Sequence, residues 1–593
     1  MTKAEILAKI EARYTHAVNS TQYSRWRRMA EDAYRFYDGL QWTDEEMEIL
    51  MARGQPPVVI NRIAQMIDSV VGQELQTRTR IAYRPRTLDQ TDRLLAEAAT
   101  ALAYQTQELE DTSYKRSLSG KDCLIGGIGW ICLTNSDGRP RMEHIDPFEM
   151  VWDADDTSSD LSKALYVHRH RMLDILEAKR AFPAYKQDLD DLMTTTGVSN
   201  ADQLPFAATG GYDDSRTLNY ADPKLDKVRI IHTQYKKAGK AYRFMDASKR
   251  MKQVLEYDVA LEFAESKDSI TEVAVDEIWE AFWTHGILMY HAPAASQTGE
   301  LEYLPLVYKR RKNDLVPYGL VEQAKDPQVE FNKRRSKMMH LLNTQGVIAD
   351  ATAIDDPNQL RAELAKPNFV LLKKQGTELR LENNLQLAQG QLQVMNQAAL
   401  DIQAASGVYE EFMGQETNAT SGLAIGRRQL STTKGKAFFF DTMRRYQKNM
   451  GRLLLALMQA AYNEQTVIAV MGDQSQEGRE IILNQPSERN GRTYFVNDFA
   501  TANFDVYVEE VPEYDAPPHE VREAIMQIAG NGQWAILGSP ELAAQLGIRN
   551  AKEIAKAVAP LIGASQQSAE APTATGTGQM PAMPSPIMGG SGE

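Results

Sequence analysis

Hydrophobic residues recur at helical spacing over long parts of the chain. Before residue 120, apolar side chains three or four positions apart predict helices around 29–37 and 63–71. More regular patterns predict a helix at 385–409 and a very long helix at about 421–463. The apolar seam of the 385–409 helix consists of Leu385, Ala388, Leu392, Met395, Ala399, Ile402, Ala405 and Tyr409. The seam of the 421–463 helix includes Phe439, Met443, Tyr446, Met450, Leu453 and Leu457.

Short apolar runs bounded by turn residues predict strands between these helices. The run LIGGIGWICL at 124–133 is followed by the turn NSDGRP, which predicts a strand and a hairpin. Further runs at 165–170, 228–235 and 279–290 make 120–310 a mixed α+β region, in which 186–226 is expected to be irregular. The fold class predicted from these patterns is α+β and predominantly helical.

The second half of the chain adds four more features. A helix after Pro305 is expected to kink or split at Pro327, because proline lacks an N–H and clashes with the preceding turn. Between 346 and 383, two β-like runs, GVIAD and NFVLLKK, flank a short helix at 357–365. Strands are predicted near 466–483 and 493–511, and helices at 517–530, 540–546 and 550–561. The Gly- and Pro-rich tail after Gly563 is expected to be disordered.

Composition narrows the class of protein. The 593 residues correspond to roughly four structural units at about 150 residues per domain. The net charge is −14, with 80 acidic against 66 basic residues, which argues against tight binding to a phosphate backbone. Cys123 and Cys132 cannot form a disulfide framework, and on one strand they would lie too far apart to bond, which fits a reducing compartment. The start, MTKAEILAKIEARY, resembles a charged amphipathic helix rather than a signal peptide, and no run approaches the roughly 18 apolar residues of a membrane span.

Charge differs sharply between the two long helices. The 385–409 helix is rich in glutamine, and Asp401 is the only charged residue between Glu382 and Glu410. The 421–463 helix is basic, with Asp441 its only acidic residue on the stretch that carries Arg427, Arg428, Lys434, Lys436, Arg444, Arg445, Lys448 and Arg452. A polar, turn-forming segment, SGVYEEFMGQETNATSG, separates the two helices.

Candidate catalytic chemistry is weak throughout the sequence. GGIGWIC is an incomplete dinucleotide fingerprint, and a strand with close backbone packing explains it better. His168 and His170 share a face of a predicted strand and follow a group of acidic and histidine residues, which are Glu143, His144, Asp146, Asp153, Asp155 and Asp156. Their spacing matches no EF-hand, zincin or two-metal pattern, so solvated loop acids and edge-strand histidines are the favoured interpretation. The sequence predicts no catalytic residue, no metal ligand and no cofactor.

The order of parts resembles bacteriophage portal proteins, especially the family of short-tailed phages typified by phage P22. The strings that carry the resemblance are FYDGLQW at 36–42, PYGL at 317–320 followed by DPQVEFNKRRS, and SGLAIGRRQ at 421–429. The resemblance implies a ring, usually of twelve subunits, at one vertex of the capsid. The implied regions are a wing (1–310), a stem helix (315–345), a clip (346–383), a second stem helix (384–408), a tunnel loop (409–420), a long wing helix with strands (421–511), a helical crown (513–562) and a tail (563–593).

The same resemblance implies a non-enzymatic role in the virion, with assembly in the host cytoplasm. Double-stranded DNA would pass through the ring without sequence-specific binding during packaging and ejection. The implied partners are further copies of the chain, the terminase large subunit, head–tail adaptor and tail proteins, and capsid and scaffolding proteins, with no membrane contact. The expected channel-lining residues are Gln386, Gln389, Gln393 and Gln397, and the expected tunnel-loop residues are Glu410, Glu411, Gln415, Glu416, Thr417 and Asn418.

Each of these readings has an alternative. Both apolar seams are expected to look exposed in a single subunit, because a ring would supply their partners. Without the family context, a glutamine-rich helix face is most often ordinary solvated surface, and the loop suits an ordinary helix–helix connection. The basic stripe suits pairing with acidic residues of another subunit at least as well as contact with DNA. Rival functions are a metal-dependent nucleic-acid enzyme that uses Asp153, Asp155 and Asp156, and another virion component such as an adaptor or internal protein.

Overall fold

The computed structural model divides the chain into two units, Met1–Val511 and Pro512–Glu593. It describes residues 2–76, 79–86, 89–199, 220–245, 251–264, 266–294, 299–343, 346–350, 356, 375–382, 385–408, 422–462, 466–470, 479–489, 492–499, 502 and 504–510. The predicted helices beyond 513, the tail, the run NFVLLKK and the short helix at 357–365 therefore lie outside the described residues. Everything below concerns the first unit.

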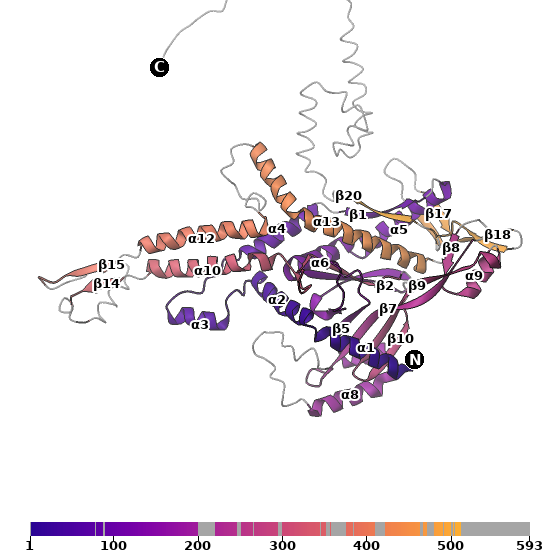
Figure 1. The fold of residues 1–593 in the computed structure, drawn as a ribbon, viewed down its shortest axis with the longest axis horizontal. Helices are drawn as coiled ribbons and strands as arrows, with labels where there is room; N and C mark the ends of the chain where they lie inside the picture. The colour runs from indigo at the N-terminus through magenta and orange to yellow at the C-terminus, as the bar shows by residue number, and fades with distance from the viewer. Residues whose placement is uncertain are drawn as a thin grey trace, which may run out of the picture. The chain divides into compact units, whose positions relative to one another are not determined.

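This unit begins with four helices and then combines further helices with runs of strands (Figure 1). The helices are α1 (Lys3–Val18), α2 (Thr21–Tyr37), α3 (Asp44–Ala52), α4 (Arg62–Gln76), α5 (Gln90–Leu109), α6 (Thr112–Gly126), α7 (Ile175–Ala181), α8 (Lys186–Ser199), α9 (Tyr257–Phe263), α10 (Val321–Asn343), α12 (Leu385–Ser406) and α13 (Gly422–Ala461). The strands up to residue 293 are β1 (Thr79–Pro85), β2 (Ile128–Ser136), β3 (Arg139–Ile145), β4 (Met150–Trp152), β5 (Tyr166–Asp174), β6 (Ala221–Asp222), β7 (Lys227–Met245), β8 (Met251–Val254), β9 (Thr271–Thr284) and β10 (Ile287–Pro293). Those that follow are β11 (Tyr303–Val307), β12 (Lys309–Arg310), β13 (Pro317–Tyr318), β14 (Gly346–Ala349), β15 (Leu379–Glu382), β16 (Thr466–Val470), β17 (Arg479–Leu483), β18 (Gln485–Arg489), β19 (Arg492–Val496) and β20 (Phe504–Glu510).

The mixed α+β region contains a seven-stranded antiparallel sheet. Its main order is β10-β9-β7-β5-β4, and the short strands β6 and β8 pair with β7. Helices α1 and α2 bury aromatic side chains near it, and the rings of Trp26 and Trp152 meet edge to face at 4.9 Å. The indole of Trp26 also donates to the carbonyl of Gly126 at 2.9 Å, which ties α2 to the end of α6. The predicted strands at 165–170 and 228–235 are confirmed by β5 and β7, whereas the run at 279–290 contains the end of β9, a turn and the start of β10. Helix α8 occupies part of the stretch expected to be irregular.

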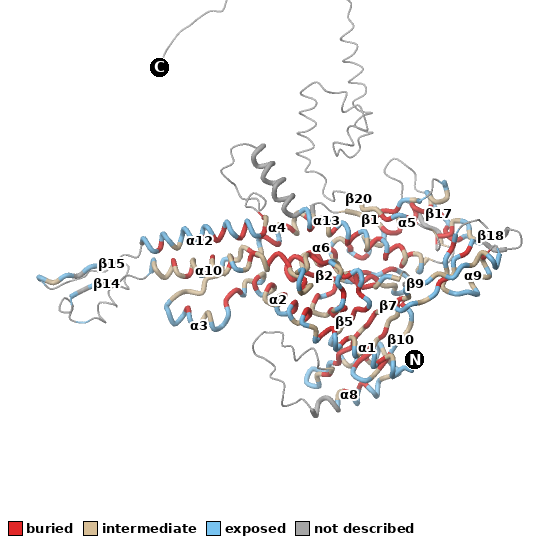
Figure 2. Tube along the Cα trace, in the orientation of Figure 1, coloured by how far each residue is buried: buried red, intermediate tan, exposed pale blue. Residues whose placement is uncertain are grey.

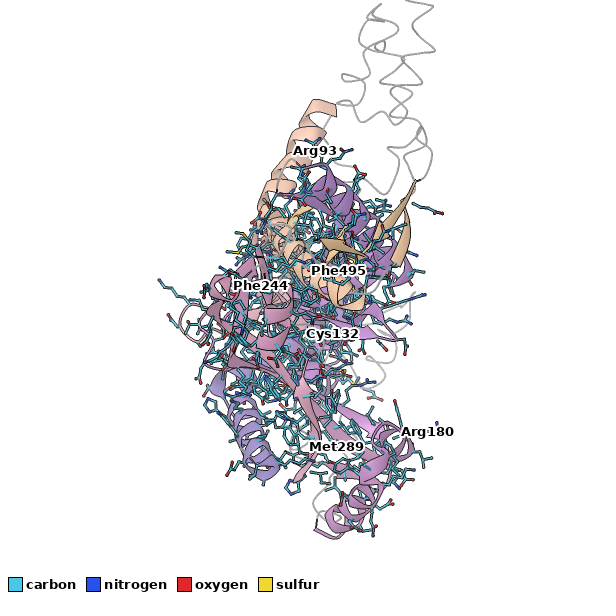
Figure 3. The ribbon with its side chains drawn as sticks, turned by 90° about the vertical axis from the view of Figure 1, so that its right-hand side faces the viewer. Arg93, Cys132, Arg180, Phe244, Met289 and Phe495 are labelled. Atoms are coloured by element: carbon cyan, nitrogen blue, oxygen red, sulfur yellow. The ribbon has the colours of Figure 1, made fainter. Side chains whose placement is uncertain are left out.

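The hairpin of β2 and β3 is confirmed, but its first strand starts later than predicted. Residues 124–126 belong to α6, and Gly127, with φ +89°, ends the helix. A Cβ at Gly127 would lie 2.4 Å from the backbone nitrogen of Tyr318, so a tertiary contact fixes this helix end as well. Cys123 therefore lies on α6 and Cys132 on β2, so the two do not share a strand. Both thiols are free and buried, and Figure 3 shows Cys132 among the packed side chains of the interior.

Helix α10 continues through Pro327, so of the two expectations, a kink or a split, the split into two helices is wrong. Proline removes one backbone hydrogen bond, but side chains of the next turns bond to other elements. The Gln328 amide donates to the carbonyl of Ile60 at 2.8 Å, and the Asn332 amide donates to the side-chain oxygen of Gln41 at 2.6 Å. These contacts hold the helix against the chain that precedes α4.

The seam of α13 is buried within the chain, against expectation. All six of its predicted residues are buried, from Leu457 at 0% exposed to Met443 at 6%. They contribute to one core cluster with α4, α5, α6, β1, β2 and β20. The core of the subunit thus supplies the partner that was expected from a neighbouring copy in a ring.

The seam of α12 is also largely covered within the chain. Ala388, Met395, Ala399 and Ile402 are buried, and α12 lies side by side with α10 (Figure 1). Leu392 is 41% exposed and Ala405 is exposed, so only part of the seam has the predicted appearance. The side chains of Leu385 and Tyr409 are outside those that the structure describes.

A buried ionic cluster joins four elements of the core. Arg116 on α6 binds the Glu74 carboxylate on α4 at 2.6 Å and donates to the backbone carbonyl of Thr79 on β1 at 3.1 Å. The Gln447 amide on α13 donates to the same carbonyl at 2.6 Å. Arg116 and Glu74 are both buried, so their charges depend on each other and on these hydrogen bonds.

Removing one member of this cluster should be costly. We expect Arg116→Ala to lower the free energy of unfolding by about 3–5 kcal/mol, because Glu74 would stay buried without its cation. The control is Arg80→Ala, which removes an exposed pair with Glu108 at 3.8 Å and should cost no more than about 1 kcal/mol. Urea unfolding followed by tryptophan fluorescence compares the two variants. Equal losses would contradict the assigned role of the buried pair.

A buried histidine should make stability depend on pH. Burial lowers the pKa of His168 to about 3 from an ordinary 6.5, while its Nδ1 lies 2.7 Å from the Thr233 hydroxyl. Between these pH values the unfolded chain binds a proton that the folded chain does not, so stability should fall as pH falls from 6.5. In His168→Asn, the slope of unfolding free energy against pH should become shallower by about 1.4 kcal/mol per pH unit. An unchanged slope would refute this assignment.

Candidate functional site

The four glutamines singled out on α12 share one exposed face of the helix. Gln386, Gln389, Gln393 and Gln397 are all exposed. At about 100° per residue they lie opposite the side chains that pack within the chain. Figure 2 shows the corresponding alternation of exposed and buried positions along α12. Asp401, which accepts a hydrogen bond from the Gln397 amide at 2.9 Å, is the only charged residue of the helix.

Gln403 and Gln391 of α12 do not belong to this face, whereas Asn396 and Asp401 are exposed at its edges. Gln403 is 8% exposed, and Gln391 accepts a long hydrogen bond, 3.4 Å, from Arg334 on α10. Two cations of α10 have acidic neighbours: Lys333 lies 3.1 Å from Glu46 on α3, and Arg334 lies 3.0 Å from Glu330 on α10 itself. The exposed surface of α12 therefore carries glutamines and a single charge, Asp401, and no cation.

The C-terminal end of α12 is anchored to α4. Gly407, with φ +66°, donates its N–H to the carbonyl of Gln403 at 2.7 Å, and the N–H of Val408 is bonded to the Ser406 hydroxyl at 3.2 Å. Val408 is buried beside a cavity of about 200 Å³ that Ile60 and Met66 also line. The predicted loop residues Glu410, Glu411, Gln415, Glu416, Thr417 and Asn418 lie outside the described residues.

A larger cleft, of about 870 Å³, runs along the basic side of α13. Phe438, Arg445, Lys448 and Arg452 line it from the helix. Segments 159–164 and 300–310 contribute further lining residues. Arg445 pairs with Asp160 at 2.6 Å. The side chains of Arg427, Arg428, Lys434 and Lys436 are outside those that the structure describes.

Two of the three acidic residues considered as metal ligands, Asp153 and Asp156, accept hydrogen bonds from nearby groups of the chain. The two carboxylate oxygens of Asp153 accept the N–H groups of Asp155 at 3.1 Å and Leu165 at 3.0 Å. Asp156 accepts bonds from both the N–H and the hydroxyl of Ser158. Asp153 and Asp156 are buried, so the interpretation of these two as solvated acids is wrong. Asp155 is exposed and lies 3.6 Å from His16.

The two histidines of β5 are buried or half-buried, and the upstream residues Glu143 and His144 bind other side chains. Strand β5 lies between β4 and β7 and His168 is fully buried, so the edge-strand interpretation is wrong. Burial likewise lowers the pKa of His170 well below its ordinary value. Glu143 forms a two-pronged pair with Arg169, with both distances 2.7 Å, and these hydrogen bonds lower the pKa of its carboxyl. His144 binds Asp122 at 2.7 Å.

Within the described part of the chain, no group of three or more His, Cys, Asp or Glu side chains is arranged to hold a metal ion. Close backbone packing explains the glycine-rich run, as predicted, because a Cβ at Gly129 would lie 2.1 Å from the carbonyl oxygen of Ser119. Among the helices described, none combines the length and apolar character that crossing a membrane requires.

Comparison with known proteins gives one family. The phage P22-like portal protein family matches residues 12–587. The portal protein of Helicobacter pylori bacteriophage KHP30 is 19% identical over 458 residues, which are 74% of this chain and 64% of that protein. The matched region thus spans less than two thirds of that relative's length.

One solved structure, described as the virion of a native gene transfer agent particle, contains a chain that is 10% identical. The alignment covers 82% of this chain and 99% of that chain, with a TM-score of 0.27, which supports no argument about fold. The family match is much stronger evidence for the family, because it extends over nearly the whole sequence and includes α10, α12 and α13. The chain belongs to the phage P22-like portal protein family.

Proposed function

We propose that the chain is one subunit of a closed ring, of twelve copies, at the portal vertex of a phage capsid. DNA would pass through the ring when the genome is packaged and again when it is ejected. Membership of the portal family supports this role. The observation that carries the channel is the exposed face of α12 formed by Gln386, Gln389, Gln393 and Gln397, which has no cation.

A neutral wall suits a conduit for DNA. The duplex carries one negative charge per about 1.7 Å, and a wall of lysine or arginine would bind it through counterion release. Glutamine amides offer hydrogen bonds without that electrostatic attraction. The segment 409–420, with three glutamates and no cation, would narrow the channel as a loop at the end of α12.

The remaining regions receive roles from the same proposal. Residues 1–310 and 421–511 form the wing, 315–345 and 384–408 the stem, 346–383 the clip and 513–562 the crown. The antiparallel pair of β14 and β15 belongs to the clip, since it joins the ends of α10 and α12. Terminase and later the tail or adaptor proteins would dock there, while capsid and scaffolding proteins would contact the wing. The subunit itself uses no cofactor and has no catalytic role.

Electron microscopy of the purified protein tests the ring directly. We expect closed rings from the wild type and from Asp155→Ala, because Asp155 is an exposed loop residue in this proposal. Neither protein should cut plasmid DNA in the presence of Mg²⁺. Single particles at high protein concentration would contradict the ring. Cleavage by the wild type that Asp155→Ala abolishes would favour the metal-dependent enzyme instead.

Charge added to the α12 face tests the channel wall. In a variant with lysine at positions 386, 389, 393 and 397, we expect the rings to hold duplex DNA. In a plot of log affinity against log salt concentration, the slope should become more negative by about 0.9 for each phosphate that the lysines contact. Fluorescence anisotropy of a labelled duplex against NaCl measures this slope.

The matched control places glutamate at the same four positions. It changes the same side chains by the opposite charge and should bind DNA no better than the wild type. Rings of the lysine variant that bind DNA as weakly as the glutamate variant would show that this face does not line the channel.

A further inference from the structure

The cleft beside α13 has an apolar floor and an aromatic rim. Trp130, Trp152, Leu304 and Leu306 belong to its lining, and all four are largely buried. Phe438 stands at the edge, 57% exposed, with its ring centre 6.3 Å from that of Tyr308. A phenylalanine this exposed beside a concave apolar surface is typical of an interface and not of a free surface.

The cleft carries more basic than acidic side chains. Its lining includes Lys236, Lys309, Arg310, Arg445, Lys448 and Arg452, against Asp160, Glu300 and Asp441. Two of the cations are compensated within the chain: Arg445 binds Asp160 at 2.6 Å, and Arg310 donates to the carbonyls of Ser158 and Asp156. The excess of positive charge therefore rests on the lysines and on Arg452.

The spacing of the α13 cations is unfavourable for an isolated helix. Arg444, Lys448 and Arg452 are four residues apart and all exposed, and like charges at this spacing destabilise a helix by about 0.2–0.5 kcal/mol per pair. An acidic partner across Lys448 and Arg452 would turn this repulsion into attraction. The chain as a whole has a net charge of −14, so another copy of it offers acidic surface.

We propose that this cleft receives an acidic, partly apolar segment of the neighbouring copy in the ring. The inference rests on the proposed ring, which places every copy beside an identical neighbour in a fixed orientation. DNA fits the cleft less well. Acidic residues stand among its cations, and a duplex offers no apolar surface for Phe438 or the floor to cover.

Charge reversal in the cleft tests the contact. In Lys448→Glu/Arg452→Glu, we expect a shift from rings to single copies, seen as at least a tenfold higher protein concentration for half-assembly. The control, Arg93→Glu/Arg444→Glu, changes the net charge by the same amount at exposed positions outside the cleft lining and should assemble as the wild type does. Native mass spectrometry measures the assembled fraction, and circular dichroism verifies that each variant is folded.

The outcomes separate this inference from the ring itself. Wild-type protein that stays single would overturn both. Wild-type rings together with unimpaired assembly of the cleft variant would overturn the cleft alone, and so would equal impairment of the control.

Crosslinking identifies the occupant independently of assembly strength. A photoreactive benzoylphenylalanine at position 438 is introduced into a mixture of ¹⁵N-labelled and unlabelled copies, with labelled duplex DNA present. We expect crosslinked peptide pairs that contain one heavy and one light partner, with acidic residues in the captured peptide. Crosslinks confined to a single copy, for example to its own C-terminal residues, or crosslinks to DNA would refute the proposal.

Discussion

The burial of α13 inside the subunit is the constraint on which the rest of the described structure depends. Its seam packs against elements from both ends of the sequence, and Gly451 lets β1 and β20 approach so closely that a Cβ there would lie 2.5 Å from Val506 and 2.8 Å from Ile81. β1 and β20 pair along seven residues on this helix. Because the N-terminal helices and the C-terminal strands share one core, α4 and α10 are held in place, and α12 packs against both.

Periodicity predicted which helices exist but could not say what covers them. The bounds of α12 and α13 agree with the sequence patterns within three residues, because long seams leave little freedom in where a helix starts and ends. The same seams gave no information on whether their partner is the same chain or a neighbour, and the core of the subunit supplied it. Pro327 and Gly127 illustrate a related limit. Helix α10 continues through Pro327, where side chains of the next turns bond to Ile60 and Gln41, and a close contact with Tyr318 accompanies the end of α6 at Gly127.

Of the two candidate surfaces, one could be predicted from the sequence and the other could not. The exposed glutamine face of α12 follows from spacing alone, since residues three and four apart share a face. The cleft could not be predicted, because its lining comes from segments around 130, 160, 236, 305 and 445 that only the fold brings together. One signal was present in the sequence, the basic stripe of α13 with the single acid Asp441. Burial could not be predicted from the sequence either, so Asp153, Asp156 and His168, which are buried, were assigned to solvated or edge positions.

Under the proposed function, the contrast in charge between α12 and α13 follows from two different contacts. Helix α12 faces DNA that must move past it, whereas α13 faces an acidic segment of the neighbouring copy that must stay bound. A face without cations lets the duplex move without releasing counterions. Cations set beside an apolar floor act in a drier environment, where an ion pair is stronger than at an open surface. If Lys448 and Arg452 stood instead where Gln389 and Gln393 stand, the same charges would hold DNA in the channel and leave the cleft without its attraction for the next copy.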